Sequence, residues 1–216
     1  MMNKIRIPSI LLLLVLPLLA LSLQGCVEMA VVGAGAAAMS AVDRRTTGAQ
    51  VDDEGIELRA TNRVSERFGD RVHVNITSFN RSVLVTGEVP DEKAKAEIGK
   101  IVTGTPNVRS VTNDLQVAGG SSFSSRASDA TITGKVKARF LDANRFNTLL
   151  VKVVTEASVV YLMGIVTESE AAAAVEVART TGGVRKVVKV FEYCKPADAI
   201  CAPSKAKAEE PKKSGS

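Results

Sequence analysis

The chain has 216 residues and a net charge of +5, and it contains no tryptophan and few other aromatic residues. A core built without large aromatic side chains favours small aliphatic α/β units over a large enzyme with a deep pocket. The positive charge is weak and forms no dense basic stripe with interleaved aromatic residues, which argues against a nucleic-acid partner.

The N-terminal segment has the features of a secretory signal. Lys4 and Arg6 provide a basic start, and an apolar run follows over residues 10–23. That run is too short for a transmembrane helix, which needs about 20 residues, and it suits the hydrophobic region of a signal peptide. We predict a signal peptide over residues 1–25. Its removal takes away those two cations and lowers the net charge from +5 to +3.

The signal ends in Leu23-Gln24-Gly25-Cys26, which resembles the lipobox of bacterial lipoproteins. The resemblance implies cleavage before Cys26 and acylation of its thiol, with palmitate among three acyl chains. Two or more chains hold a protein stably at a membrane. Val27 is not the aspartate that commonly retains lipoproteins in the inner membrane. The expected location is therefore the periplasmic face of the outer membrane. An ordinary cysteine behind an ordinary signal peptide is the alternative.

Low-complexity segments divide the mature chain. An Ala- and Gly-rich stretch over residues 26–50 is interpreted as a tether that begins at the lipidated cysteine, and the Gly- and Ser-rich stretch 118–128 as a flexible linker. Together they delimit two blocks, 51–117 and 129–193. Residues 194–216 form a C-terminal extension, and its tail of Lys, Glu, Ala and Pro is predicted to be disordered.

The two blocks are repeats of each other. Residues 72–106 align without a gap with residues 149–183. In both copies a strand that alternates apolar and polar residues is followed by a more apolar strand, which carries Gly87 or Gly164 at the same place. Such a glycine predicts a bulge or a close backbone approach. An acid-rich helix start and a last strand then follow in each copy.

A helix precedes the strands of each copy. Apolar residues recur there with helical spacing, at Ile56, Ala60 and Val64 and again at Ile132, Val136 and Phe140. Asp52 or Asp53, and Asp129 in the second copy, are predicted to be the N-caps of these helices. Each unit is therefore expected to be an α+β fold of order α-β-β-α-β, in which two helices cover one face of a three-stranded sheet.

Such a unit resembles the BON domain. The most specific stretches are residues 43–53 (DRRTTGAQVDD), 163–168 (MGIVTE) and 183–191 (GVRKVVKVF). Two units behind a lipobox resemble the dual BON-domain outer-membrane lipoproteins, over nearly all of residues 26–193. The resemblance implies binding of anionic phospholipids, such as phosphatidylglycerol and cardiolipin, through the first helix of the second domain. It also implies support of envelope integrity, enrichment at cell-division sites and contact with the machinery that assembles outer-membrane proteins.

The predicted outward face of that helix, taken to span residues 129–145, carries Lys137, Leu141 and Arg145. A leucine between two cations suits an interfacial membrane contact, because the leucine enters the acyl boundary while the cations meet phosphates. Thr131 is the fourth residue of this predicted site. The lipid-binding proteins that the sequence resembles carry a tryptophan at this position. The threonine of this chain therefore implies a weaker contact or a different partner. From the residues alone, Leu141 could instead pack against the other domain.

No familiar catalytic or metal-binding motif stands in the sequence. His73, the only histidine, is predicted to be a surface or satisfied core residue on a strand. With Cys26 acylated, Cys194 and Cys201 remain as a pair, and we predict a disulfide between them, with a metal site as the alternative. We expect no enzymatic activity, cofactor or metal. A protein-interaction module for an outer-membrane assembly or envelope-stress partner is the alternative function.

Overall fold

The computed structural model describes residues 43–120 and 122–201. The predictions on the signal peptide, Cys26, most of the tether and the tail lie outside the described residues. The first repeat consists of α3 (Thr47–Phe68), η1 (Gly69–Arg71), β1 (His73–Phe79), β2 (Ser82–Val89), α4 (Glu92–Thr103), β3 (Ser110–Asn113) and β4 (Gln116–Val117). The second consists of α5 (Phe123–Ala143), η2 (Thr148–Leu150), β5 (Lys152–Glu156), β6 (Val159–Val166), α6 (Glu168–Arg179) and β7 (Lys186–Tyr193).

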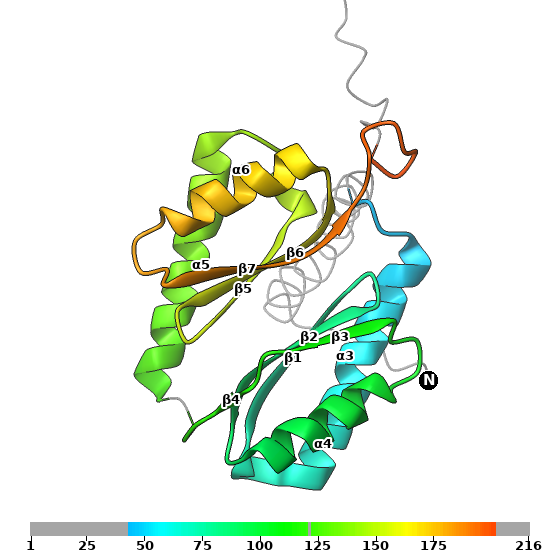
Figure 1. The fold of residues 1–216 in the computed structure, drawn as a ribbon, viewed down its shortest axis with the longest axis vertical. Helices are drawn as coiled ribbons and strands as arrows, with labels where there is room; N and C mark the ends of the chain where they lie inside the picture. The colour runs from blue at the N-terminus through cyan, green and yellow to red at the C-terminus, as the bar shows by residue number, and fades with distance from the viewer. Residues whose placement is uncertain (1–42, 121, 202–216) are drawn as a thin grey trace, which may run out of the picture. The chain divides into compact units, whose positions relative to one another are not determined.

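Both repeats have the predicted order α-β-β-α-β, and the α+β fold is confirmed (Figure 1). In each, the first two strands form an antiparallel hairpin and the last strand returns parallel to the central one. The first sheet differs from the three-stranded prediction because its last strand is split into β3 and β4. Leu115 lies in the break with its side chain fully buried in the core, and its N–H donates to the Asn113 side-chain oxygen at 3.3 Å. In the second repeat β7 continues without a break.

Two helices cover one face of each sheet (Figure 1). In the first repeat, α3 packs on the sheet through Ile56, Ala60 and Val64. These side chains share one apolar cluster with Val83 and Val85 of β2. The second repeat has the same arrangement, with Ile132, Val136 and Phe140 of α5. The helical stripes predicted from residue spacing are therefore confirmed.

The opposite faces of the two sheets share a third apolar cluster. Phe79 and Leu84 from the first repeat pack there with Tyr161, Met163 and Ile165 from β6. Both repeats belong to one compact unit, Val42–Ser216. The central strands β2 and β6 are consequently buried on both faces, which is why their sequences are apolar runs without clear alternation.

The two aligned glycines allow a close backbone approach, as their position in the sequence predicted. A side chain at Gly87 would collide with the carbonyl oxygen of His73 on the neighbouring strand, and Gly87 also has a φ of 117°. A side chain at Gly164 would collide in the same way with the carbonyl oxygen of Leu150. Only glycine leaves room for the neighbouring backbone at these places.

The predicted N-caps are wrong, and the acidic residues have another role. Asp53 and Asp129 lie inside their helices and are buried. Asp53 accepts hydrogen bonds from the backbone N–H groups of Asn80 and Arg81, at 2.8 and 2.7 Å. These two residues form the β1–β2 turn with φ values of 52° and 63°, a left-handed conformation that non-glycine residues rarely adopt. The aspartate therefore stabilises the strained turn.

The same arrangement recurs in the second repeat. Asp129 accepts from the N–H groups of Ala157 and Ser158, at 3.0 and 2.8 Å. The actual helix caps stand earlier in the chain, at Thr46 and Ser122, whose side chains accept from N–H groups in the first turn. The predicted flexible linker is thus helical from Phe123 onward, and α3 begins inside the predicted tether.

Cys194 and Cys201 are joined in a disulfide, with their Cα atoms 6.1 Å apart. The bridge closes a short loop directly after β7, and Cys201 is buried. Among the described residues, no helix has the length and apolar character needed to cross a membrane.

Candidate functional site

An apolar and basic surface lies at the C-terminal end of α5. We define this α5-end surface by four residues, Lys137, Leu141, Arg145 and Leu149. All four side chains are exposed. Leu141 is 66% exposed and Leu149 is 51% exposed, although leucine is normally a core residue. Leu141 is therefore not buried against the other repeat.

Arg145 lies beyond the helix, which corrects the prediction that it shares a helical face with Leu141. The helix ends at Ala143 because Asn144 adopts the left-handed conformation, with φ 44° and ψ 37°. Its N–H donates to the carbonyl of Phe140 at 3.3 Å, and asparagine is among the few residues that tolerate this C-terminal geometry. Arg145 and Leu141 nevertheless line one hollow of about 380 Å³.

Leu149 begins the stretch of the second repeat that aligns with the first, where the sequence predicted an alternating strand. It lies instead in the short helix η2, which precedes β5. The Asn147 side chain caps this turn by accepting from the N–H of Leu149 at 3.1 Å. Leu149 is thereby turned outward, while Leu150 and Val151 next to it are buried. Leu149 and Leu141 line the same groove.

Thr131 is not brought together with the other predicted site residues. It precedes Leu141 by ten positions on α5, which corresponds to about 15 Å along a helix axis. Its hydroxyl donates to the carbonyl of Ala127 at 2.9 Å within the helix itself. Thr131 is exposed, but it lies outside the α5-end surface.

The groove beside α5 has a volume of about 470 Å³. Three cations line it, namely Arg45, Lys137 and Lys152. The rest of the lining is apolar apart from Thr148, and consists of Phe79, Phe140, Leu141, Leu149, Val151 and Val153. Two of the cations are already engaged. Arg45 pairs with Asp53 at 2.8 Å, and Lys152 pairs with Glu57 at 3.1 Å. Within residues 43–120 and 122–201, neither Lys137 nor Arg145 forms an ion pair, so their charges face solvent.

Arg44 fixes the start of the described chain onto the second repeat. Its guanidinium donates to both carboxylate oxygens of Glu170, at 2.6 and 3.0 Å, and to the carbonyl of Ile165 at 2.9 Å. Burial by itself would raise the pKa of Glu170, but the hydrogen bonds from Arg44 and Thr167 lower it below its usual value. Sequence reasoning identified residues 43–53 only as a family signature and missed this contact.

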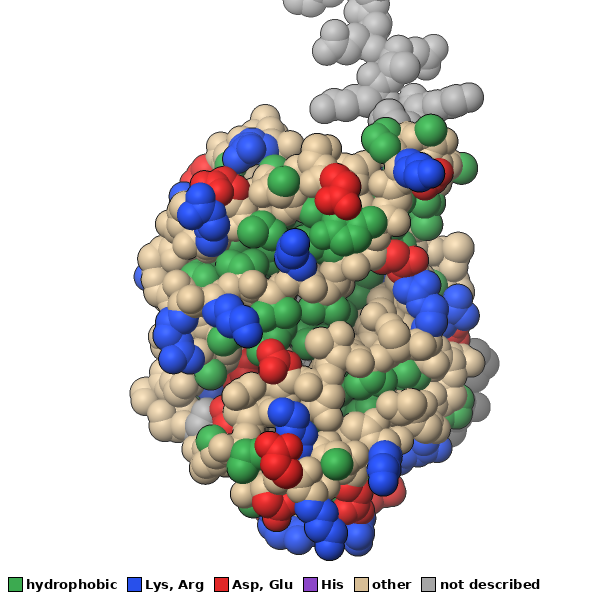
Figure 2. Space-filling model, in the orientation of Figure 1, with side chains coloured by type: hydrophobic (Ala, Val, Ile, Leu, Met, Phe, Trp, Pro, Cys, Tyr) green, Lys and Arg blue, Asp and Glu red, His purple; other side chains and the backbone are tan. Residues whose placement is uncertain are grey.

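One face of the molecule is mixed in charge. Figure 2 shows one face on which hydrophobic side chains reach the surface between scattered Lys, Arg, Asp and Glu side chains, without one large patch of a single charge. Such a surface does not attract polyanions over long distances.

Comparison with known proteins places these observations in a family. Residues 52–119 and 128–195 each match the BON domain. The chain is 38% identical over 173 residues to "Outer membrane lipoprotein DolP" from Haemophilus influenzae, and the alignment covers 79% of this chain and 90% of that protein. The chain belongs to the DolP family of dual BON-domain lipoproteins. The predicted family resemblance is thereby confirmed, and membership in the DolP family makes the chain an outer-membrane lipoprotein.

A second relative is similar over most of its own length. The "21 kDa hemolysin" of Actinobacillus pleuropneumoniae is 32% identical over 154 residues, which cover 70% of this chain and 79% of that protein. Among solved structures, the C-terminal domain of CdsD from the type III secretion system of Chlamydia trachomatis aligns with 62% of this chain and 95% of its own. Its identity is 12% and its TM-score is 0.28. A score this low carries no conclusion about this chain.

Proposed function

We propose that this DolP-family lipoprotein is held at the periplasmic face of the outer membrane by acylated Cys26 and binds anionic phospholipids through its α5-end surface. Phosphatidylglycerol and cardiolipin are the proposed ligands. The protein acts by binding and not by catalysis. The family resemblance supports two further parts of the proposal, a role in envelope integrity and enrichment at division sites.

One observation carries the proposal. Leu141 is 66% exposed and lies between two cations, Lys137 and Arg145, that form no ion pair within the part of the chain that the structure describes. Leu149, half-exposed beside the same groove, adds a second apolar side chain. Such a group places carbon in the acyl boundary and positive charge at the level of the phosphates.

The expected contact is weak, which suits a protein that is already anchored. Burying a leucine contributes about 2 kcal/mol, and each cation near an anionic surface contributes about 1 kcal/mol. Two half-exposed leucines and two cations therefore give about 4 kcal/mol, which corresponds to a dissociation constant on the order of 1 mM. On a tethered protein, a contact of this strength orients the domains against the membrane and reverses readily.

Vesicle cosedimentation tests the proposal. The chain from Val27 to Ser216 lacks the acyl anchor and contains the whole compact unit Val42–Ser216. We expect it to sediment with phosphatidylglycerol vesicles at low salt and to be released at high salt, because salt screens exposed charges. It should not sediment with phosphatidylcholine vesicles. Equal binding to both lipids would contradict the role of the cations. Binding to neither would favour the alternative function, in which an outer-membrane assembly or envelope-stress protein is the partner.

A further inference from the structure

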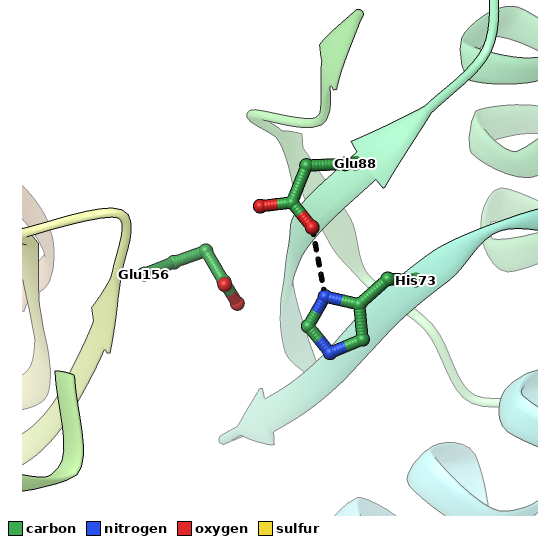
Figure 3. A group of neighbouring side chains, drawn as sticks. All are labelled: His73, Glu88 and Glu156. Atoms are coloured by element: carbon green, nitrogen blue, oxygen red, sulfur yellow. Dashed lines mark hydrogen bonds and ion pairs between the residues drawn. The ribbon is translucent and has the colours of Figure 1, made fainter. Parts of the chain in front are cut away.

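The structure brings together three ionisable side chains that are far apart in the sequence. His73 on β1 and Glu88 on β2 are directly paired across the first hairpin, and the imidazole Nδ1 lies 2.9 Å from a Glu88 carboxylate oxygen. Glu156, the last residue of β5 in the second repeat, points toward both of them (Figure 3). One nitrogen or oxygen atom from each of the three residues lies within 4.8 Å of the others.

We propose that His73, Glu88 and Glu156 form a binding site for a divalent transition-metal ion, with Zn²⁺ as the best-suited ion. One imidazole nitrogen and two carboxylate oxygens are ligand types that Zn²⁺ uses in proteins. Ligand atoms around one ion lie about 3 to 4 Å from each other, given metal–ligand distances near 2 Å. The observed separations therefore need only small side-chain rotations. Three protein ligands leave further positions for water.

The burial of the carboxylates favours a cation at this place. Glu88 is 7% exposed and Glu156 is 6% exposed, and buried charges are costly unless a cation or strong hydrogen bonds offset them. The hydrogen bonds of Glu156 come from two neutral groups, the Asn75 amide at 2.6 Å and the Thr86 hydroxyl at 3.4 Å. An ion bound between the two carboxylates would offset the cost of burying their charges.

The position of the site suggests what the ion does. His73 and Glu88 belong to the first repeat and Glu156 to the second, so the ion would connect the two domains. The side chain of His73 is 26% exposed, which gives the site an opening to solvent. Because the ion binds the folded arrangement and not the unfolded chain, it would stabilise the docking of the two repeats.

The test uses the full-length, untagged protein, freed of metal with a chelator and kept in detergent. Because His73 is the only histidine, its imidazole proton signals in the NMR spectrum report on this site without any substitution. We expect one equivalent of ZnCl₂ to shift or broaden these signals and to raise the thermal unfolding midpoint, and MgCl₂ to do neither. Unchanged imidazole signals at saturating ZnCl₂ would overturn the proposal.

Two variants locate the ion. His73→Gln and Glu156→Gln each remove a ligand, and we expect at least a tenfold weaker affinity for Zn²⁺ in calorimetric titration, on the order of the losses seen when a metal site is perturbed. Glu168→Gln, which changes an exposed carboxylate at the start of α6, serves as the control and should bind like the unsubstituted protein. Full affinity in both ligand variants would place the ion elsewhere and overturn the proposal. Should a variant not fold, the histidine signals of the unsubstituted protein decide the question.

Discussion

Replacing Gly87 with alanine is expected to destabilise the protein by about 4 kcal/mol, near the upper end of single substitutions. The new methyl group would meet the carbonyl oxygen of His73 on β1, and backbone atoms inside a sheet cannot move aside. The φ of 117° adds strain for any residue with a side chain. The measurement is urea unfolding followed by circular dichroism, which gives the free energy of unfolding.

Gly134→Ala is the matched control for this substitution. Gly134 lies inside α5 with open space around its Cα, and alanine in an exposed helix is favoured over glycine by up to about 1 kcal/mol. The two changes add the same methyl group and should have opposite signs. A Gly87→Ala protein within about 1 kcal/mol of the unsubstituted one, on the order of ordinary surface changes, would show that the close approach at β1 is not maintained.

The second prediction concerns the α5-end surface. Leu141→Glu should weaken binding to phosphatidylglycerol vesicles by about thirtyfold, because it removes about 1 kcal/mol of apolar transfer, the share of one half-exposed leucine, and adds about 1 kcal/mol of repulsion. The fold should be unaffected, since the side chain is 66% exposed. Cosedimentation over a series of lipid concentrations measures the change.

Leu58→Glu provides the control for charge. Leu58 is 64% exposed on α3, the corresponding helix of the first repeat, and the substitution changes the net charge equally. Vesicle binding by this variant should equal that of the unsubstituted chain. If both variants lost the same affinity, overall charge and not the α5-end surface would govern binding.

The repeat and its core were predictable because burial leaves a strong periodic signal in the sequence. The stripes Ile56–Ala60–Val64 and Ile132–Val136–Phe140 recur at the spacing that a helix requires when one face is buried. The helix starts were not predictable in this way. The first turns of α5 are polar or exposed, with Phe123 81% exposed, so the apolar period begins well after the helix does. An aspartate at that later point then resembles an N-cap.

The role of Asp53 and Asp129 depends on the hairpin turn, which is distant in the sequence. Each aspartate accepts from two turn residues 27 to 29 positions away. A pattern read along one helix contains no information about such a contact. Aligning the repeats offered one usable sign, because both copies place an aspartate at the same position of the first helix, Asp53 and Asp129.

The binding surface was predictable in part. Helical spacing of about 100° per residue correctly puts Lys137 and Leu141 on the outward face of α5. Arg145 and Leu149 depend on the end of the helix, which Asn144 sets through a left-handed backbone that spacing cannot predict. The cross-strand pair His73–Glu88 follows from the turn at Asn80 and Arg81 once the register is known. The approach of Glu156 requires the packing of one repeat on the other.

The most direct test places a fluorescent reporter at the proposed contact. The chain has no tryptophan, so Leu141→Trp introduces a single indole at the α5-end surface, and Leu58→Trp introduces one on the first repeat. With phosphatidylglycerol vesicles, the emission of the Leu141→Trp protein should shift to shorter wavelength as the ring leaves water. The same protein with phosphatidylcholine vesicles, and the Leu58→Trp protein with either lipid, should show no shift. An unchanged emission from the Leu141→Trp protein in the presence of phosphatidylglycerol would contradict insertion of this surface into the membrane.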